Sequence, residues 1–157
     1  MTDDTIAVVN KLRALGISLG TPPRPGGSYV AVNIRANIAY VAIQFPIAEG
    51  KFIHTGRIGR DIATEQGYEA ARAAAINVLS QINESIGFER IVGLNHLDIY
   101  FQADDNWDEG PKVANGASDL FLAALGDRGK HTRAIMGVHK LSRGHCVAVV
   151  ASFTVKE

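Results

Sequence analysis

The segment CVAVVASFTV, residues 146–155, constrains the fold more than any other part of the chain because it contains no charged residue. Successive side chains of a β-strand point to opposite faces of the sheet. One face would carry Val147, Val149, Ala151, Phe153 and Val155, and the other would carry Ala148, Val150, Ser152 and Thr154 after Cys146. A strand with so little polarity on either face is typical of a sheet that is covered on both sides.

The remaining patterns predict one domain of 157 residues with two main helices. An alanine-rich helix is expected from Glu65 to about Ile86, with Thr64 as its N-cap and Gly87 after its end. Its predicted buried stripe excludes Gln81. A second helix is expected over residues 111–126, which begin with proline and end with glycine. The predicted strands span residues 29–35, 38–45, 90–102 and 132–138, with a turn at residues 36–37 between the first two.

A shorter helix is expected at the N-terminus, within an extension formed by residues 1–20. Apolar residues at Ile6, Val9, Leu12 and Leu15 predict its buried stripe, and Gly16 is expected to end it.

Two long helices can shield only one face of the predicted sheet. The uncharged strand therefore indicates that other subunits cover the second face, as in a closed homo-oligomer.

Composition narrows the class of partner. Sixteen basic and sixteen acidic residues cancel, and the isoelectric point is near 7.0. Such a chain has no long-range attraction for a polyanion, so we expect no nucleic-acid partner. No secretory pattern and no apolar run of ~20 residues is present, which predicts a cytoplasmic protein without a membrane partner.

The sequence shows no metal or cofactor motif. The loop ADDNWDEG, residues 103–110, resembles a calcium loop but has its glycine one residue too late. His139 and His145 could meet across the turn between them, and a packed or surface pair is favoured over a metal site. Cys146 lies in an apolar strand and is expected to be a buried, inert thiol.

One arginine interrupts an otherwise apolar strand in GKHTRAIMGV, residues 129–138. The guanidinium of Arg133 stays charged, so burying it without a partner is costly. Its planar fork of donors suits a carboxylate ligand. The spacing alone favours a strand-end arginine paired with a surface acid, and both readings remain open at this point.

Several long segments resemble the RidA/YjgF family, also called the YjgF/endoribonuclease L-PSP family, over about residues 26–155. They are SYVAV (28–32), the following strand with its Gln44 and Pro46, GRIGRDIATEQGYEAAR (56–72) and KVANGASDLFLAALGDRGKHTRAIMGVHKL (112–141). The extra N-terminal helix is similar to that of a longer subgroup.

The resemblance implies an α/β (α+β) fold of the chorismate-mutase-like type: a mostly antiparallel sheet, two main helices on one face and a homotrimer with a central barrel. It implies cofactor-free hydrolysis of enamines and imines to 2-keto acids and ammonia in clefts between subunits. Arg133 resembles the carboxylate anchor of the family, and Tyr29 resembles its aromatic cleft wall. Further cleft-lining candidates are Ile43, Gln44, Asn115, His131, Ile135 and Val150.

The sequence departs from the family where the chemistry is expected. The family commonly has Ser-Gly-Gln where this chain has Ala42, Ile43 and Gln44. Glutamates are common in its last strand at positions that match Ala148 and Val150 here. The catalytic residues are therefore unassigned, and His54, His131, Asn115 and Ser118 are possible substitutes.

Three hypotheses follow. The first is an imine or enamine deaminase, and the second is a non-catalytic small-molecule binding protein with the same cleft. The third, an endoribonuclease, is disfavoured by the zero net charge.

Overall fold

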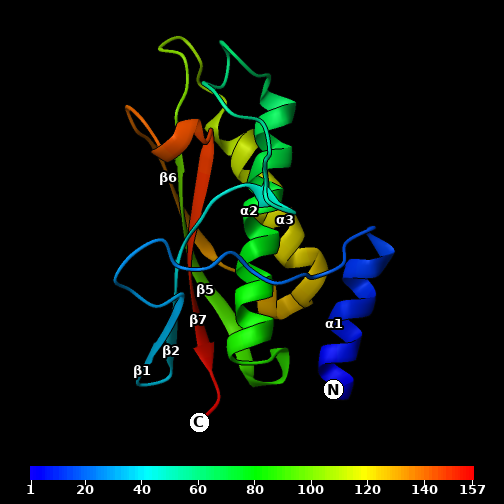
Figure 1. Cartoon of the computed structure of the whole chain (residues 1–157). Coiled ribbons are helices and arrows are strands. Elements are labelled where there is room, and N and C mark those ends of the chain that lie inside the picture. Colours follow the sequence, from blue (N-terminus) through cyan, green and yellow to red (C-terminus); the bar gives the residue numbers. More distant parts are fainter.

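Helices α2 and α3 cover one face of a five-stranded sheet in the computed structural model, which describes residues 1–157 (Figure 1). Helix α1 packs on α3 rather than on the sheet. None of the helices combines the length and the hydropathy that crossing a bilayer requires. The helices are α1 (Asp3–Ala14), α2 (Thr64–Ser85) and α3 (Gly110–Leu125), with 3₁₀ turns η1 (Phe88–Arg90), η2 (Gly126–Gly129) and η3 (Ser142–Gly144).

The strands of the main sheet lie in the order β1-β2-β7-β5-β6. All neighbours are antiparallel except β5 and β6, which are parallel. This confirms the mostly antiparallel sheet with two main helices on one face. The strands are β1 (Val32–Arg35), β2 (Ile38–Gln44), β5 (Ile91–Phe101), β6 (Thr132–Gly137) and β7 (Val147–Val155), and β3 (Ile47–Ala48) and β4 (Lys51–Phe52) form a separate hairpin.

The predicted N-cap of α2 is wrong by one residue. Ala63 is the N-cap, and its backbone N–H donates to the side chain of Gln66 at 2.8 Å. Thr64 is the first helical residue, and its hydroxyl instead donates to Glu109 at 2.6 Å. The threonine therefore joins α2 to the start of α3 instead of capping its own helix.

The exclusion of Gln81 from the buried face of α2 is also wrong, because this side chain is only 2% exposed. Its amide donates to the carbonyl of Pro23 at 2.8 Å and to Gln44 Oε1 at 3.3 Å. The proline-rich connector crosses over α2 (Figure 1) and brings polar backbone that needs a donor. A polar residue is thus buried with its hydrogen bonds satisfied.

The buried face of α1 differs from the predicted stripe. Thr5, Val8 and Leu12 are buried, whereas Ile6 and Leu15 are 40% and 45% exposed. A helix that packs on one other helix, as α1 does on α3, needs only a narrow apolar face. The end of the helix at the following glycine, which has φ +77°, is as predicted.

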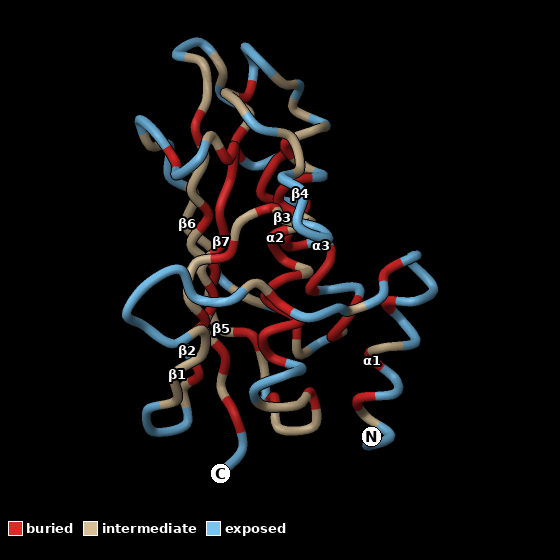
Figure 2. The backbone as a smooth tube through the Cα atoms, in the orientation of Figure 1, coloured by how far each residue is buried: buried red, intermediate tan, exposed pale blue.

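The two faces of the sheet differ sharply within one chain. In β7, the residues that face the helices, from Val147 to Val155, are buried. On the other face Ala148 is also buried, but Val150, Ser152 and Thr154 are half-buried. Figure 2 colours the backbone by this burial. On the same open face, Tyr40 is 52% exposed beside Ser152. The chain therefore covers only one face of its own sheet.

The strand predicted from residue 29 begins three residues later, at Val32. Residues 28 and 29 lie in a bend instead, and Tyr29 is half exposed. Its hydroxyl accepts a hydrogen bond from the backbone of Gly26 at 3.1 Å. The turn at residues 36–37 is as predicted, with Ala36 at φ +45°.

Candidate functional site

Arg133 lies on the edge strand β6, and its side chain reaches helix α3 on the covered side of the sheet. Its Nη1 donates to Asn115 Oδ1 at 2.8 Å and to Ser118 Oγ at 3.0 Å. Both acceptors are neutral, and Arg133 forms no ion pair. Pairing with a surface acid, which the spacing alone favoured, is therefore wrong, and the guanidinium charge has no counter-ion in the chain.

His131 stands beside the arginine and completes a small hydrogen-bonded group. Its Nε2 lies 2.8 Å from Ser118 Oγ, and its Nδ1 lies 2.6 Å from the carbonyl oxygen of Gly129. Gly129 is buried, and a Cβ there would collide with the carbonyl of Phe121. Only glycine lets the turn pass this close to α3, so the turn places the imidazole over the helix.

A shallow cavity of about 330 Å³ opens beside these groups. Ser118, Leu122, Lys130, His131 and Arg133 line it. No acid lines the cavity, and although Lys130 pairs with Asp127 at 3.1 Å, the charge of Arg133 has no counter-ion. The cavity therefore favours an anionic ligand.

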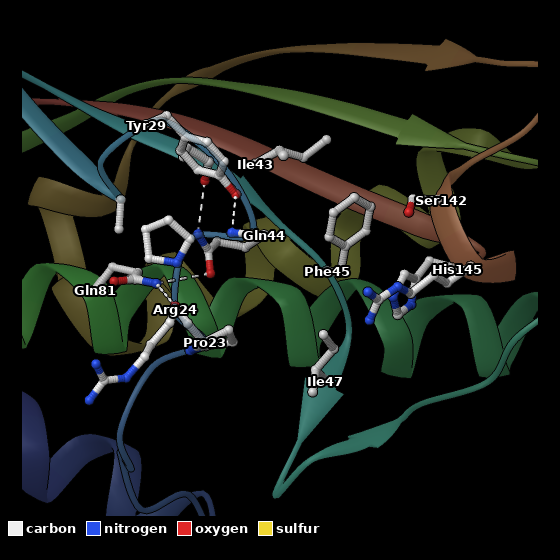
Figure 3. A pocket seen from close by; sticks show the side chains of 15 residues that line it. Pro23, Arg24, Tyr29, Ile43, Gln44, Phe45, Ile47, Gln81, Ser142 and His145 are labelled. Carbon is white, nitrogen blue, oxygen red and sulfur yellow. Dashed lines mark hydrogen bonds between the residues drawn. The ribbon is translucent and has the colours of Figure 1, made fainter.

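Tyr29, Ile43 and Gln44 line a different cavity, of about 310 Å³ (Figure 3). It lies where the pairing of β2 with β7 slips between Val41 and Gln44, and such bulges redirect side chains beside functional sites. Gln44 is 6% exposed, and its side-chain amide donates to the carbonyl oxygen of Ala42 at 2.9 Å, which fixes the side chain in the cavity wall.

Three residues of this second cavity were not predicted from the sequence. Arg24 and Arg143 line it, neither has a side-chain partner, and no acid is among the lining residues. His145 lies at the end of the cavity opposite Arg24 (Figure 3). It is 2% exposed and packs on the rings of Phe45 and Phe52, with centroid distances of 4.7 and 4.5 Å. The available sequence signals were weak: an arginine between prolines and a basic turn before the last strand.

The environment of His145 keeps its imidazole neutral. Burial, and after it the charge of Arg143, lowers its pKa below the ordinary range, and its Nδ1 has no hydrogen-bond partner. No pair with His139 forms, because that side chain is exposed and His145 packs on phenylalanine rings instead. The chain gathers no group of three or more potential metal ligands.

The two remaining candidates lie apart from the cavities. Ile135 shares the face of Arg133 but packs against the hydrophobic core. Val150 is paired across the sheet with Asp98, and both lie on the open face. Arg133 is paired with Leu97, the neighbour of Asp98, and both lie on the covered face. Val150 is therefore not brought next to Arg133 within one chain.

Two further side chains are accounted for by local contacts. His54 lies 2.7 Å from Glu69 Oε2 and lines neither the cavity beside Arg133 nor the cavity beside Tyr29. Cys146 is fully buried, and burial raises the pKa of its thiol to about 12, as expected for an inert cysteine.

The order of the strands separates the two parts of the predicted site. The cavity with Tyr29 and Ile43 lies at the β1–β2 edge, and Arg133 lies on β6 at the opposite edge. One chain alone does not bring Tyr29 and Arg133 together.

Comparisons with known proteins agree with this architecture. Residues 10–153 match the profile of the YjgF/chorismate mutase-like endoribonuclease family. The chain is 33% identical over 146 residues to Protein TCP17 of Trypanosoma cruzi, with 92% of this chain and 91% of that protein covered. The crystal structure of Atu1372 from Agrobacterium tumefaciens superposes with a TM-score of 0.92 at 28% identity, with 97% and 94% of the two chains covered.

A more distant structure shares the fold. E. coli TdcF with bound serine superposes with a TM-score of 0.62 at 16% identity, covering 87% of this chain and 94% of that one. Since the family profile spans most of the sequence and the fold agrees with it, the chain belongs to the YjgF/RidA family of chorismate mutase-like proteins.

Proposed function

We propose that this protein binds a small metabolite with a carboxylate group at Arg133 and hydrolyses its imine or enamine form to a 2-keto acid and ammonia. The observation that carries the proposal is the arginine itself. Its guanidinium is oriented by Asn115 and Ser118, both neutral, and lines a cavity without acids. An oriented cation without a counter-ion is suited to a planar anion such as a carboxylate.

The proposed site is completed by a neighbouring subunit in a homotrimer. A head-to-tail ring would set the β6 edge of one subunit beside the β1–β2 edge of the next, since these edges lie at opposite ends of the sheet. Tyr29 and Ile43 of one subunit would then face Arg133 of its neighbour. The same ring would turn the open face of each sheet inward as a barrel and so cover the half-buried side chains, such as Val150 and Ser152, that one chain leaves accessible.

The ligand class is supported by chemistry and by a relative. TdcF, a distant relative with the same fold, binds serine, whose carboxylate is the kind of group that Arg133 would hold. Two charge-assisted hydrogen bonds from one guanidinium contribute ~1.5–3 kcal/mol each, which suffices to orient a small substrate. A fixed carboxylate would place the adjacent imine carbon within the cavity for attack by water.

Binding without catalysis is the second candidate. It is favoured by Ala148 and Val150, which stand where family members commonly carry glutamate and which lie on the open face of the sheet. The bulky side chain of Ile43, which lines the cavity of Tyr29, also favours binding without catalysis.

The test combines binding, activity and mass. Calorimetry with pyruvate, 2-oxobutyrate and L-serine should detect binding to the wild type, and Arg133→Ala should weaken it at least ~100-fold for the loss of about 3 kcal/mol. Ammonia release should be followed from freshly generated 2-aminoacrylate. Arg13→Ala, an exposed arginine of α1, is the matched control.

The outcomes separate the candidates. Binding with ammonia release supports the deaminase, and binding without release supports the binding protein. No binding of any carboxylate, or equal binding by Arg133→Ala, would refute both. Light scattering should give three times the 16.8 kDa chain mass, and a monomer in solution would refute the composite site.

A further inference from the structure

Ser118 and His131 carry the only hydroxyl and the only imidazole that line the cavity of Arg133, and they are in direct contact with each other. Ser118 Oγ is 2.8 Å from His131 Nε2 and 3.0 Å from Arg133 Nη1. Residues from α3 and from the turn before β6 meet at this point, so the arrangement needs no second subunit. None of these contacts could be predicted from sequence spacing.

The direction of each hydrogen bond follows from its partners. The carbonyl oxygen of Gly129 can only accept, so the nearby Nδ1 of His131 carries the proton. In the neutral ring Nε2 is then the free base and accepts the hydroxyl proton of Ser118. Arg133 donates to the same hydroxyl oxygen, and this favours negative charge on Oγ. The serine proton is therefore directed toward a base, while a cation faces the oxygen that gives it up.

Proton-transfer sites require a group that gives up a proton, a base that takes it and a third group that orients them, and Ser118, His131 and Arg133 have this arrangement. Ser118 is 7% exposed, and both it and His131 line the cavity that Arg133 enters. Arg133 uses only one of its two terminal nitrogens for its contacts with α3. A carboxylate held by the rest of the guanidinium would lie beside the Ser118 hydroxyl.

We propose that Ser118 and His131 form the proton-transfer pair for imine hydrolysis and replace the glutamates that this chain lacks. The inference rests on the proposed function. Water attacks the iminium carbon, and the C=N electron pair moves to nitrogen. Ser118 takes the proton of the attacking water as it passes its own to His131 Nε2. The imidazolium returns this proton through Ser118 to the amine. The C–N bond then breaks, the hydroxyl electron pair forms the carbonyl, and the hydroxyl proton leaves with ammonia as ammonium.

A purely structural role for the pair makes a different prediction. If Ser118 and His131 only hold Arg133 in place, their loss should weaken carboxylate binding, with no change in the pH dependence of kcat. If they transfer protons, carboxylate affinity should change little, because Asn115 still orients the arginine. The pH profile of kcat should then lose the limb that belongs to an imidazole.

The experiment measures ammonia release from 2-aminoacrylate, and separately pyruvate affinity, for four variants and one control variant. Ser118→Ala and His131→Gln should each lower kcat by ~10²–10⁴, and the double variant should be no worse than the lower single variant because the residues act as a unit. Ser118→Thr, which keeps the hydroxyl, should recover most of the activity. His139→Gln, an exposed histidine outside both cavities, is the control.

Each outcome has one meaning. Full activity in Ser118→Ala or His131→Gln, with an active wild type, overturns the pair but leaves the deaminase intact. Parallel losses of kcat and pyruvate affinity with an unchanged pH profile show a structural role and also overturn it. A wild type without ammonia release removes the proposed reaction and the pair together. Nitrogen-15 NMR of the folded protein should find the Nδ1–H tautomer of His131 in every variant that keeps His131.

Discussion

Replacing Gly116 with alanine tests how tightly the helix that carries the site is held. Gly116 is buried in α3 between Asn115 and Ser118, on the side that meets α2. A Cβ at this position would overlap the carbonyl oxygen of Tyr68, lie 2.9 Å from its carbonyl carbon and lie 3.2 Å from the Cβ of Ala71. The obstacle is helix backbone, which cannot rotate away.

Two opposing effects set the size of the change. Glycine to alanine in a helix ordinarily stabilises by ~1 kcal/mol. Overpacking a rigid core costs ~1–3 kcal/mol, and the upper end applies because α2 itself must move. The expected net loss is about 2 kcal/mol, which for a chain of this size lowers Tm by about 4–8 °C.

Calorimetric or circular-dichroism melting measures this directly. Gly20→Ala is the matched control, since nothing lies within 4 Å of the added carbon and φ is not positive there. It should leave Tm within about 2 °C, or raise it slightly. Because Gly116 is flanked by residues that orient Arg133, the variant should also bind pyruvate more weakly. A Tm of Gly116→Ala at or above that of the wild type would show that the two helices are not in close contact.

Three further predictions concern buried or strained residues. Burial lowers the pKa of His145, so the unfolded chain binds a proton more readily and the stability of the fold should decrease as pH drops below about 6.5. His145→Phe should therefore lose less of its urea midpoint between pH 7 and pH 5 than the wild type does. An equal loss in both proteins would contradict the buried neutral ring. The thiol of Cys146, with a pKa of about 12, should resist iodoacetamide at pH 8 until the protein is unfolded, so rapid native labelling would be unexpected. Ala36 has φ +45°, and Ala36→Gly should stabilise by up to ~1 kcal/mol in urea unfolding, whereas destabilisation would mean that the turn is unstrained.

Most elements of the fold could be predicted because their signals are local. The end of α1 at Gly16, the proline in the first turn of α3 and the uncharged strand β7 each follow from a few neighbouring residues. The predicted N-cap and buried face of α2 were wrong because contacts with distant parts of the chain decide them. Thr64 bonds to Glu109 instead of capping α2, and Gln81 is buried because the connector at Pro23 crosses it.

The candidate site was only partly predictable. Arg133 stood out because a charge in an apolar strand needs a partner, and the family resemblance indicated a carboxylate. Its actual contacts depend on how β6 returns beside α3, so spacing favoured a surface acid where the structure has Asn115 and Ser118. Val150 was grouped with Arg133, but the two lie on opposite faces of the sheet.

By itself, the sequence determined the periodicity of the helices and strands, the neutral charge and the presence of one charged arginine in an apolar strand. These are properties of single residues and short windows, which carry their own physical signal. Only the tertiary structure decided that Ser118 and His131 meet beside that arginine and that Tyr29 lies at the other edge of the sheet. Such neighbours are set by the order of the strands and by the close pass of Gly129 over α3, and neither is encoded at a fixed distance along the chain.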